Sequence, residues 1–368
     1  MTTNNEHKKL NVPNLRFPEF QGEWITYKIK DVLSIGNGRD YKHLSNGEIP
    51  VFGTGGYMTS VDECLYDGET TFIGRKGSIN KPFYYNGKFW TVDTLFYTHS
   101  FNGITPKFTY CLFQTINWLK YNEASGVPSL SKDTIEKIKI MIPGLKEQNK
   151  IAKLMFALDE RITTQNKIID KLQSLIKGIV DCTILRKEKN AIVGDVCSIS
   201  EQIKAEANID DIITVRLHGN GVCKSSAENL QLGATQYYRR RAGQLIYGKQ
   251  NFHNGAIGIV PISLDNGITS KDIPSFDIDE MKCNSVYLLA QLQSPQYYKP
   301  AEALTTGTGS KRLKEEAFLK MPIVLPNKRE QDNIAVLIHR ASMNLDHAKR
   351  LLELLSIQKQ FLLRQMFI

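Results

Sequence analysis

Short clusters of glycine, arginine and lysine recur along this chain, and their residue types suit contacts to phosphate. The clusters are Arg39, Tyr41 and Lys42 after Gly36-Asn37-Gly38, Arg75 and Lys76 between Gly74 and Gly77, Arg239, Arg240 and Arg241 after Tyr237-Tyr238, and Lys249 and Gln250 after Gly248. Glycine lets a backbone approach a phosphate closely, while Arg and Lys supply positive charge. Arg and Gln can also form paired hydrogen bonds with base edges. The clusters predict contacts to nucleic acid; the alternative, for any one of them alone, is a solvated turn.

Two more clusters occupy matching places in the two halves of the chain. They are Ser129 and Lys132 after Gly126, and Ser310, Lys311, Arg312 and Lys314 after Gly309. Each brings glycine, a hydroxyl group and cations together just before the last strand expected in its half. We therefore expect phosphate contacts in both clusters.

No residues with catalytic or metal-binding spacing accompany these clusters. The segment from Gly243 to Lys249 matches the G-x-x-x-x-G-K pattern of a phosphate-binding loop, but Gln250 stands where a magnesium-binding Ser or Thr is required. The seven histidines form no H-x-x-x-H or H-E-x-x-H arrangement, so we expect no zinc site. The sequence predicts a chain without catalytic residues and without a bound metal.

Composition favours a polyanionic partner and excludes a membrane span. The net charge is +9, which suits release of counterions from a phosphate backbone. The six cysteines form no C-x-x-C pair, so we expect reduced thiols that mostly pack in the interior. No stretch approaches 18 apolar residues and no secretory signal opens the chain, which predicts a cytoplasmic protein.

A long internal repeat decides the organisation of the chain. From Gly126 to Ile368 the two halves align without gaps at a shift of 183 positions, so that Pro143 and Gln148 recur as Pro326 and Gln331. Solenoid repeats are only about 20–50 residues long. Each copy must therefore be a whole domain together with the segment that follows it, and the protein is a tandem of two similar halves.

Before each repeated segment lies a loop-rich region of mixed α/β character. Residues 17–125 and 190–308 hold short runs of β-branched and aromatic residues that end at Gly, Asn or Pro. Asn86-Gly87 gives the strongest signal for a hairpin turn between two strands. Helices are expected around residues 108–120 and 285–293.

The repeated segments themselves show the heptad spacing of a coiled coil. The residues expected to pair the helices are Ile151, Leu158, Ile162, Ile169, Leu172, Ile338, Leu345, Leu352 and Leu355. Apolar residues spaced alternately by three and four positions form one seam, with polar residues at the other positions. Two unrelated surface helices, each packed on its own domain, are the alternative. Each helix would be roughly 50 Å long at 1.5 Å per residue.

These observations predict an α+β protein with a pseudo-two-fold tandem repeat. We expect a first mixed α/β domain at 1–145, a first spacer helix at 146–186, a second domain at 187–326 and a second spacer helix at 327–368. The two long helices would lie antiparallel and hold the domains apart.

The chain resembles the specificity subunits of type I restriction-modification systems. The resemblance rests on the opening residues 15–24, the repeated Pro-x-x-x-Glu-Gln-x-x-Ile-Ala that begins at Pro143 and at Pro326, and the ending at residues 358–367. It implies two target-recognition domains, each reading one half of a split, asymmetric site in double-stranded DNA. It also implies two long helices that pair and dock two methyltransferase subunits.

The function implied by the resemblance is DNA sequence recognition without catalysis. The chain would bind no cofactor itself and would direct adenine methylation by methyltransferase subunits that use S-adenosylmethionine. With restriction/motor subunits it would direct cleavage that depends on ATP and Mg²⁺. Two alternatives stay open: a DNA-modifying enzyme that acts alone, and a coiled-coil adaptor that binds no DNA.

Overall fold

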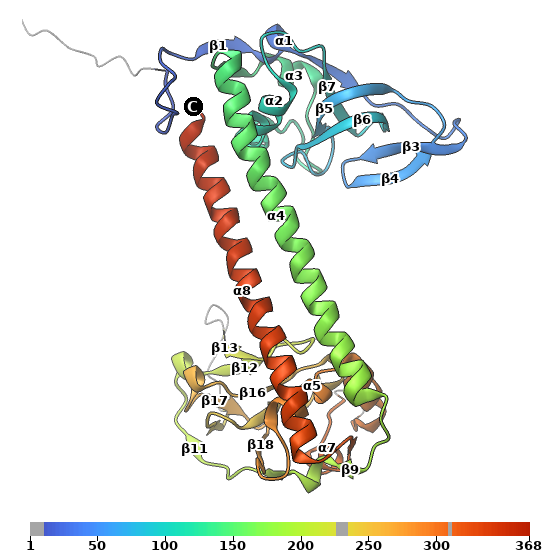
Figure 1. The fold of residues 1–368 in the computed structure, drawn as a ribbon, viewed down its shortest axis with the longest axis vertical. Helices are drawn as coiled ribbons and strands as arrows, with labels where there is room; N and C mark the ends of the chain where they lie inside the picture. The colour runs from blue at the N-terminus through green and yellow to red at the C-terminus, as the bar shows by residue number, and fades with distance from the viewer. Residues whose placement is uncertain (1–10, 226–234, 308–310) are drawn as a thin grey trace, which may run out of the picture. The chain divides into compact units, whose positions relative to one another are not determined.

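The chain folds as two compact units that share two long helices. The computed structural model describes residues 11–225, 235–307 and 311–368. The first unit comprises Met1–Asn166 with Leu351–Ile368, and the second comprises Lys167–Arg350. Figure 1 traces the chain and labels many of its helices and strands. No helix in the described ranges is long and apolar enough to cross a membrane.

The first unit is built on a mixed sheet of six strands in the order β2-β7-β5-β6-β3-β4, with a separate pair β1-β8. Its elements are β1 (Ile25–Lys28), α1 (Ile29–Val32), β2 (Ser34–Asn37), β3 (Asn46–Gly53), β4 (Gly56–Val61), β5 (Tyr66–Gly74), β6 (Phe83–Thr91), β7 (Leu95–His99), α2 (Pro106–Phe113), α3 (Lys132–Lys137) and β8 (Lys139–Ile142). The buried core joins Ile35 and Ile73 of the sheet to Phe108 of α2 and to Met155 of the first long helix. Burial of this apolar surface holds the sheet against the helix.

The predicted hairpin turn at Asn86-Gly87 is wrong. Both residues lie inside β6, where Gly87 pairs with Gly68 of β5. The two glycines have φ values of 134° and 146°, in a region that side-chain-bearing residues rarely adopt. Their missing side chains leave room for the rings of Tyr85 and Tyr66, respectively, which lie over them. The turn between β5 and β6 falls instead at residues 75–82 and carries Arg75 and Lys76.

The second unit contains shorter strands in four small sheets, with the orders β10-β18-β15-β16, β11-β14-β17, β12-β13 and β19-β9. Its strands are β9 (Ala191–Ile192), β10 (Cys197–Ile199), β11 (Lys204–Ala205), β12 (Ile213–Val215), β13 (Val222–Lys224), β14 (Tyr237–Arg239), β15 (Leu245–Tyr247), β16 (Ile257–Ile259), β17 (Ile268–Ser270), β18 (Ser275–Ile278) and β19 (Pro322–Ile323). Its helices are α5 (Ser285–Leu292), α6 (Pro295–Tyr298) and α7 (Glu315–Leu319). The core gathers stacked and tilted rings of Tyr247, Phe276 and Phe318. Because residues 245–247 form a buried strand, the match to a phosphate-binding loop is a coincidence of sequence.

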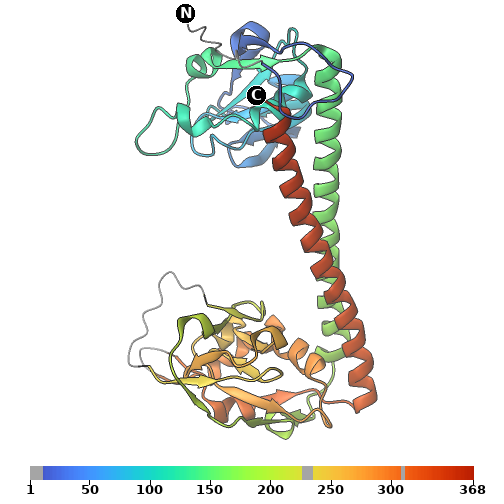
Figure 2. The same ribbon diagram turned by 90° about the vertical axis from the view of Figure 1, so that its left-hand side faces the viewer.

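The two long helices are α4 (Leu145–Val180), which ends in a π-helical turn at Asp181–Leu185, and α8 (Lys328–Met366). In the first unit the beginning of α4 packs with the end of α8, since Met155 and Met366 share one core. In the second unit the end of α4 packs with the beginning of α8, through Val180 and Ile338. The helices are therefore antiparallel, and Figure 2 shows them side by side.

Burial along α4 and α8 follows the predicted heptads. Among the predicted pairing residues, those that are buried are Ile151, Leu158, Ile169, Ile338 and Leu355, and those that are half-buried are Ile162, Leu172, Leu345 and Leu352. This pattern confirms the coiled-coil seam and excludes two unrelated surface helices. The predicted fold class, two mixed α/β domains with two long antiparallel helices, is confirmed.

The repeat is visible in the hydrogen bonds that begin each long helix. The buried Gln148 amide donates to Pro143 O at 2.8 Å and to Gly103 O at 2.9 Å, and accepts from Thr105 N at 2.9 Å. The buried Gln331 amide donates to Pro326 O at 2.8 Å and to Lys282 O at 3.1 Å, and accepts from Asn284 N at 2.9 Å. Each glutamine thus ties its helix to the residue that caps α2 or α5, which fixes the helix against its own domain.

Candidate nucleic-acid interface

In the first unit, two of the predicted clusters meet in a short bridge. Lys76 pairs with Ser129 in an isolated antiparallel β-bridge, and Gly77 N donates to Pro128 O at 2.9 Å. Leu130 N donates to Arg75 O at 2.9 Å. The loop after β5 is thereby joined to the segment before α3, with Arg75 and Lys76 exposed to solvent.

A third cluster reaches the same place through the turn between β6 and β7. Arg39 N donates to Thr91 O at 2.7 Å, and Arg75 N donates to Thr94 O at 2.8 Å. Arg39 is exposed, as are Arg75 and Lys76. The backbone of residues 91–94 therefore holds three exposed cations near one another. We call Arg39, Arg75 and Lys76 the first cationic rim. In the part of the chain that the structure describes, no carboxylate forms an ion pair with these three side chains.

The remaining candidates of the first unit lie around this rim with different surroundings. Tyr41 is half-buried and packs against a small core that includes Trp90, so its ring contributes to packing. Lys42 is exposed, and its backbone N–H donates to Asp40 Oδ1 at 3.3 Å. Lys132 begins α3 and pairs with Glu136 at 3.6 Å, an exposed ion pair of little energetic weight.

The second unit repeats the same backbone frame with different side chains. Leu313 N donates to Lys249 O at 2.9 Å, just as Leu130 N donates to Arg75 O. Lys249 follows β15 as Arg75 follows β5. The backbones of Arg75 and Lys249 thus occupy corresponding places in the two units, each bonded to one of the repeat-related residues Leu130 and Leu313.

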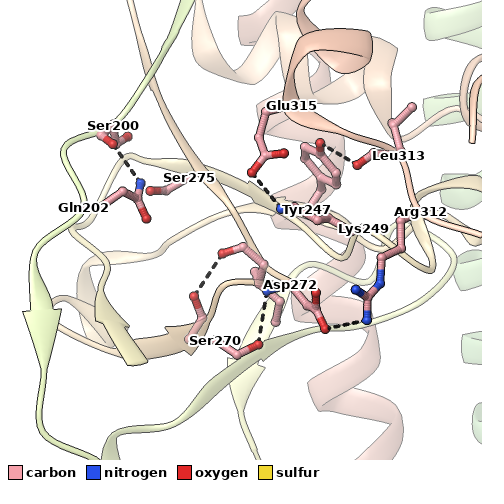
Figure 3. Close-up of polar contacts among 12 residues, drawn as sticks. Ser200, Gln202, Tyr247, Lys249, Ser270, Asp272, Ser275, Arg312, Leu313 and Glu315 are labelled. Atoms are coloured by element: carbon pink, nitrogen blue, oxygen red, sulfur yellow. Dashed lines mark hydrogen bonds and ion pairs between the residues drawn. The ribbon is translucent and has the colours of Figure 1, made fainter. Parts of the chain in front are cut away.

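Carboxylates pair with two cations of the second unit, Lys249 and Arg312, as Figure 3 shows. The Lys249 side chain is 11% exposed and its Nζ lies 2.7 Å from Glu315 Oε1. Arg312 Nη2 lies 3.3 Å from Asp272 Oδ2, and Asp272 O accepts from Lys249 N at 2.9 Å. Lys311 pairs with Glu302 at 3.1 Å. We call Lys249, Arg312, Asp272 and Glu315 the second rim. Its ion pairs orient the two cations and lower the net positive charge of this surface.

The prediction of a phosphate contact is wrong for Arg240, because its side chain is fully buried. Its guanidinium donates to Thr269 Oγ1 at 2.7 Å, to Ser275 Oγ at 2.8 Å and to Ile273 O at 2.9 Å. Burial lowers the pKa of this guanidinium, while neutral oxygens satisfy its N–H groups. Arg240 therefore organises the interior of the second unit.

The neighbours of Arg240 remain at the surface. Arg239, the last residue of β14, and Arg241 after the strand are both exposed. Gln250 and Lys314 are exposed too, and Lys314 is the residue that precedes α7. Gly309 and Ser310, also expected at this surface, lie outside the described residues.

Sequence reasoning missed the acidic members of the second rim. Glu315 directly follows Lys314, so its proximity to basic residues was visible, but its pairing with Lys249 depends on the fold. Asp272 lies far from Arg312 in the sequence and gave no signal. Within the described ranges no group of His, Cys, Asp or Glu could hold a metal ion.

Comparisons with known proteins agree with this architecture. Residues 21–174 match the family model of the type I restriction modification DNA specificity domain. The type I restriction enzyme MjaVIII specificity subunit of Methanocaldococcus jannaschii is 22% identical over 305 residues, which cover 74% of this chain and 69% of that protein. A putative type I specificity subunit of Mycoplasma pneumoniae, S.MpnORF285P, is 29% identical over 147 residues, 37% of this chain and 48% of the relative. This second match thus spans about half of its relative.

A solved structure shows the same fold over the whole chain. The S subunit of the type I restriction-modification system from M. genitalium superimposes with a TM-score of 0.72 at 12% identity, covering 97% of this chain and 99% of the other. At this identity the likeness establishes the fold alone. The resemblance of the chain to type I specificity subunits is confirmed.

Proposed function

We propose that this chain reads a split, asymmetric site in double-stranded DNA, with one half-site for each domain. The observation that carries the proposal is the shared backbone frame at Arg75 and Lys249, where Leu130 and Leu313 make the same hydrogen bond. The same frame presents a bare cationic rim in one unit and an ion-paired rim in the other. Related frames with different side chains suit two readers of different half-sites.

The chain would supply specificity, and partner subunits would supply the chemistry. Two methyltransferase subunits that use S-adenosylmethionine would dock on α4 and α8, and restriction/motor subunits would add cleavage that depends on ATP and Mg²⁺. An adenine must leave the base stack before it can be methylated, and the pocket that receives it would belong to the methyltransferase. In this scheme the chain itself transfers no methyl group and binds no cofactor.

Methylome sequencing of the host, with and without the gene, tests this proposal. The expected result is a two-part methylated motif that disappears on deletion and returns when the gene is restored. Salt-dependent binding of the purified chain to DNA separates this function from a coiled-coil adaptor. Methyl transfer by rigorously purified chain with S-adenosylmethionine alone would identify an enzyme instead.

A further inference from the structure

The hairpin formed by β3 and β4 exposes large apolar side chains near its turn. Tyr57 is 64% exposed and Met58 is 51% exposed, both at the beginning of β4. β4 is the last strand of the six-stranded sheet, and Figure 1 shows the hairpin at the edge of the first unit. Apolar residues on an edge strand invite aggregation, and natural proteins usually place charged residues there instead. These two side chains therefore mark a surface that another molecule covers.

The tip of this hairpin is small and uncharged. Gly53 pairs with Gly56, which leaves Thr54 and Gly55 as the turn. A Cβ added at Gly55 or Gly56 would meet no atom within 4 Å. Residues 49–61 contain no charged side chain. The backbone of the tip can therefore approach a ligand closely.

The first cationic rim lies beside the tip. Phe52 of β3 pairs with Thr91 of β6, and Thr91 O accepts from Arg39 N at 2.7 Å. At the turn, a Cβ added at Gly77 would lie 3.9 Å from Thr54 Oγ1, and Gly77 directly follows the last member of the rim. The uncharged tip is thus accompanied by exposed positive charge.

The opposite end of the hairpin is acidic. Glu48, Asp62 and Glu63 are exposed there, next to the pair formed by Asn46 and Val61. The charge therefore changes sign along the hairpin, with cations beside the tip and carboxylates at the base. A polyanion is attracted to the tip and repelled from the base.

Two contacts orient the exposed apolar side chains. The Tyr57 hydroxyl shares a hydrogen bond of 3.1 Å with Ser60 Oγ. Met58 Sδ lies 2.7 Å from the place that a Cβ at Gly53 would take, so the thioether occupies room that this glycine leaves. Side chains ordered in this way lose less conformational freedom when a ligand binds.

We propose that the tip of the β3–β4 hairpin enters the major groove of one DNA half-site, where Tyr57 and Met58 contact base edges. This inference rests on the proposed function and names the side chains of the first unit that read bases. A two-stranded ribbon fits the major groove, which is roughly 12 Å wide. Apolar side chains there pack on thymine methyl groups, while the first cationic rim contacts the flanking phosphates. A second copy of this chain, paired through the edge of β4, is the competing occupant.

The first experiment measures binding of the purified full-length chain to DNA that carries the methylated motif of the host, at several salt concentrations. The double variant Tyr57→Ala with Met58→Ala should bind about 10- to 100-fold more weakly. The slope of log K against log salt should stay the same, because no cation is lost. Tyr57→Phe keeps the ring and should bind like the unmodified chain. Ile25→Ala is the control, since Ile25 is 60% exposed but lies in the separate β1–β8 pair.

A second variant tests the close approach of the tip. Gly55→Ala adds a methyl group that meets no atom of the chain, so the melting temperature should not fall. The affinity for the same DNA should fall about 3- to 10-fold, because the added methyl group would collide with the base edges. Gly178→Ala is the control: its Cβ also has open space, and it lies on α4. It should leave the affinity for DNA unchanged.

Methylome sequencing of a host that carries the Tyr57→Ala and Met58→Ala variant should show altered bases in one part of the motif, with the other part unchanged. An unchanged motif together with unchanged affinity would overturn the inference and leave the proposed function intact. A smaller salt slope in the variant would also overturn it, because the hairpin would then act through phosphates. Absence of any two-part motif with the unmodified chain would overturn both. If the chain dimerised in solution and the variant did not, a second copy would be the occupant and the inference would be wrong.

Discussion

Asp159 of α4 and Lys359 of α8 form an ion pair across the helix seam of the first unit. The Lys359 side chain is 15% exposed and the Asp159 side chain is 27% exposed. The ammonium group also lies 5.9 Å from the centre of the Tyr110 ring. The matching positions in the second unit hold Ser342 and Ile176, which are uncharged. The two helix pairings, alike in their heptads, are therefore chemically different at this position.

Removal of one charge from this pair should destabilise the first unit. Asp159→Ala leaves the Lys359 ammonium inside the seam without its partner, at a cost of about 1–3 kcal/mol. The matched control is the double variant Asp159→Ser with Lys359→Ile, which copies the second unit and should cost less than Asp159→Ala. Urea unfolding measures the free energy of unfolding of the single and the double variant. Equal loss in the two variants would mean that the pairing of charges has no effect.

Arg240 should be required for stability, whereas Arg239 and Arg241 should be required for DNA binding. Arg240→Met leaves the hydroxyl groups of Thr269 and Ser275 without their donor and should cost about 2–4 kcal/mol. Arg239→Ala and Arg241→Ala should leave the melting temperature unchanged. If these two contact phosphate, each should reduce the slope of log K against log salt by roughly 0.9. An unchanged slope would make them solvated surface residues.

The second rim should bind DNA more tightly when its carboxylate is neutralised. Glu315→Gln removes the charge that pairs with Lys249 and should raise affinity for nonspecific DNA about 3- to 10-fold at low salt. Lys249→Ala should lower it. Glu316→Gln is the control, because it changes the same net charge at an exposed neighbouring residue. An equal gain in the control would point to net charge rather than to Lys249.

Gln148 and Gln331 should fasten their helices to their own domains with similar strength. Gln148→Ala and Gln331→Ala each leave one backbone N–H and two carbonyl groups without a partner, at a cost of about 1–3 kcal/mol. Hydrogen exchange should show faster opening at the beginning of α4 for the first variant and of α8 for the second. Global opening of both helices by either variant would contradict this local role.

The helices should act as the ruler between the two half-sites. Deletion of residues 162–168 together with 350–356 removes two turns from each helix, or roughly 10 Å at 1.5 Å per residue. The heptad seam is kept, and the two segments face one another if Asp159 and Lys359 fix the alignment. We expect a shorter nonspecific gap between the half-sites, measured by methylome sequencing. Full activity with an unchanged gap would rule out the ruler.

The helices could be predicted from sequence because their signal is local. Residues such as Ile151 and Leu158 recur with heptad spacing, and the same spacing decides their burial. The gapless repeat begins only at Gly126, because corresponding residues before that point are not 183 positions apart. The capping residues Thr105 and Asn284 lie 179 positions apart, so a single shift cannot align them with the helices.

The candidate site was less predictable because its chemistry depends on distant partners. Three consecutive arginines look equivalent in the sequence, yet Arg240 alone turns inward to Thr269 and Ser275. Lys249 and Glu315 are far apart in the chain, and only the fold shows that they neutralise each other.

The core of the first unit includes Met366 and Phe367, with Phe367 stacked on Phe108 and set edge-on against Trp24. The second unit is built from one continuous segment, Lys167–Arg350. During synthesis the ribosome therefore releases every residue of the second unit before the last core residues of the first. The unit that is translated first therefore cannot complete its core until Met366 and Phe367 have been made.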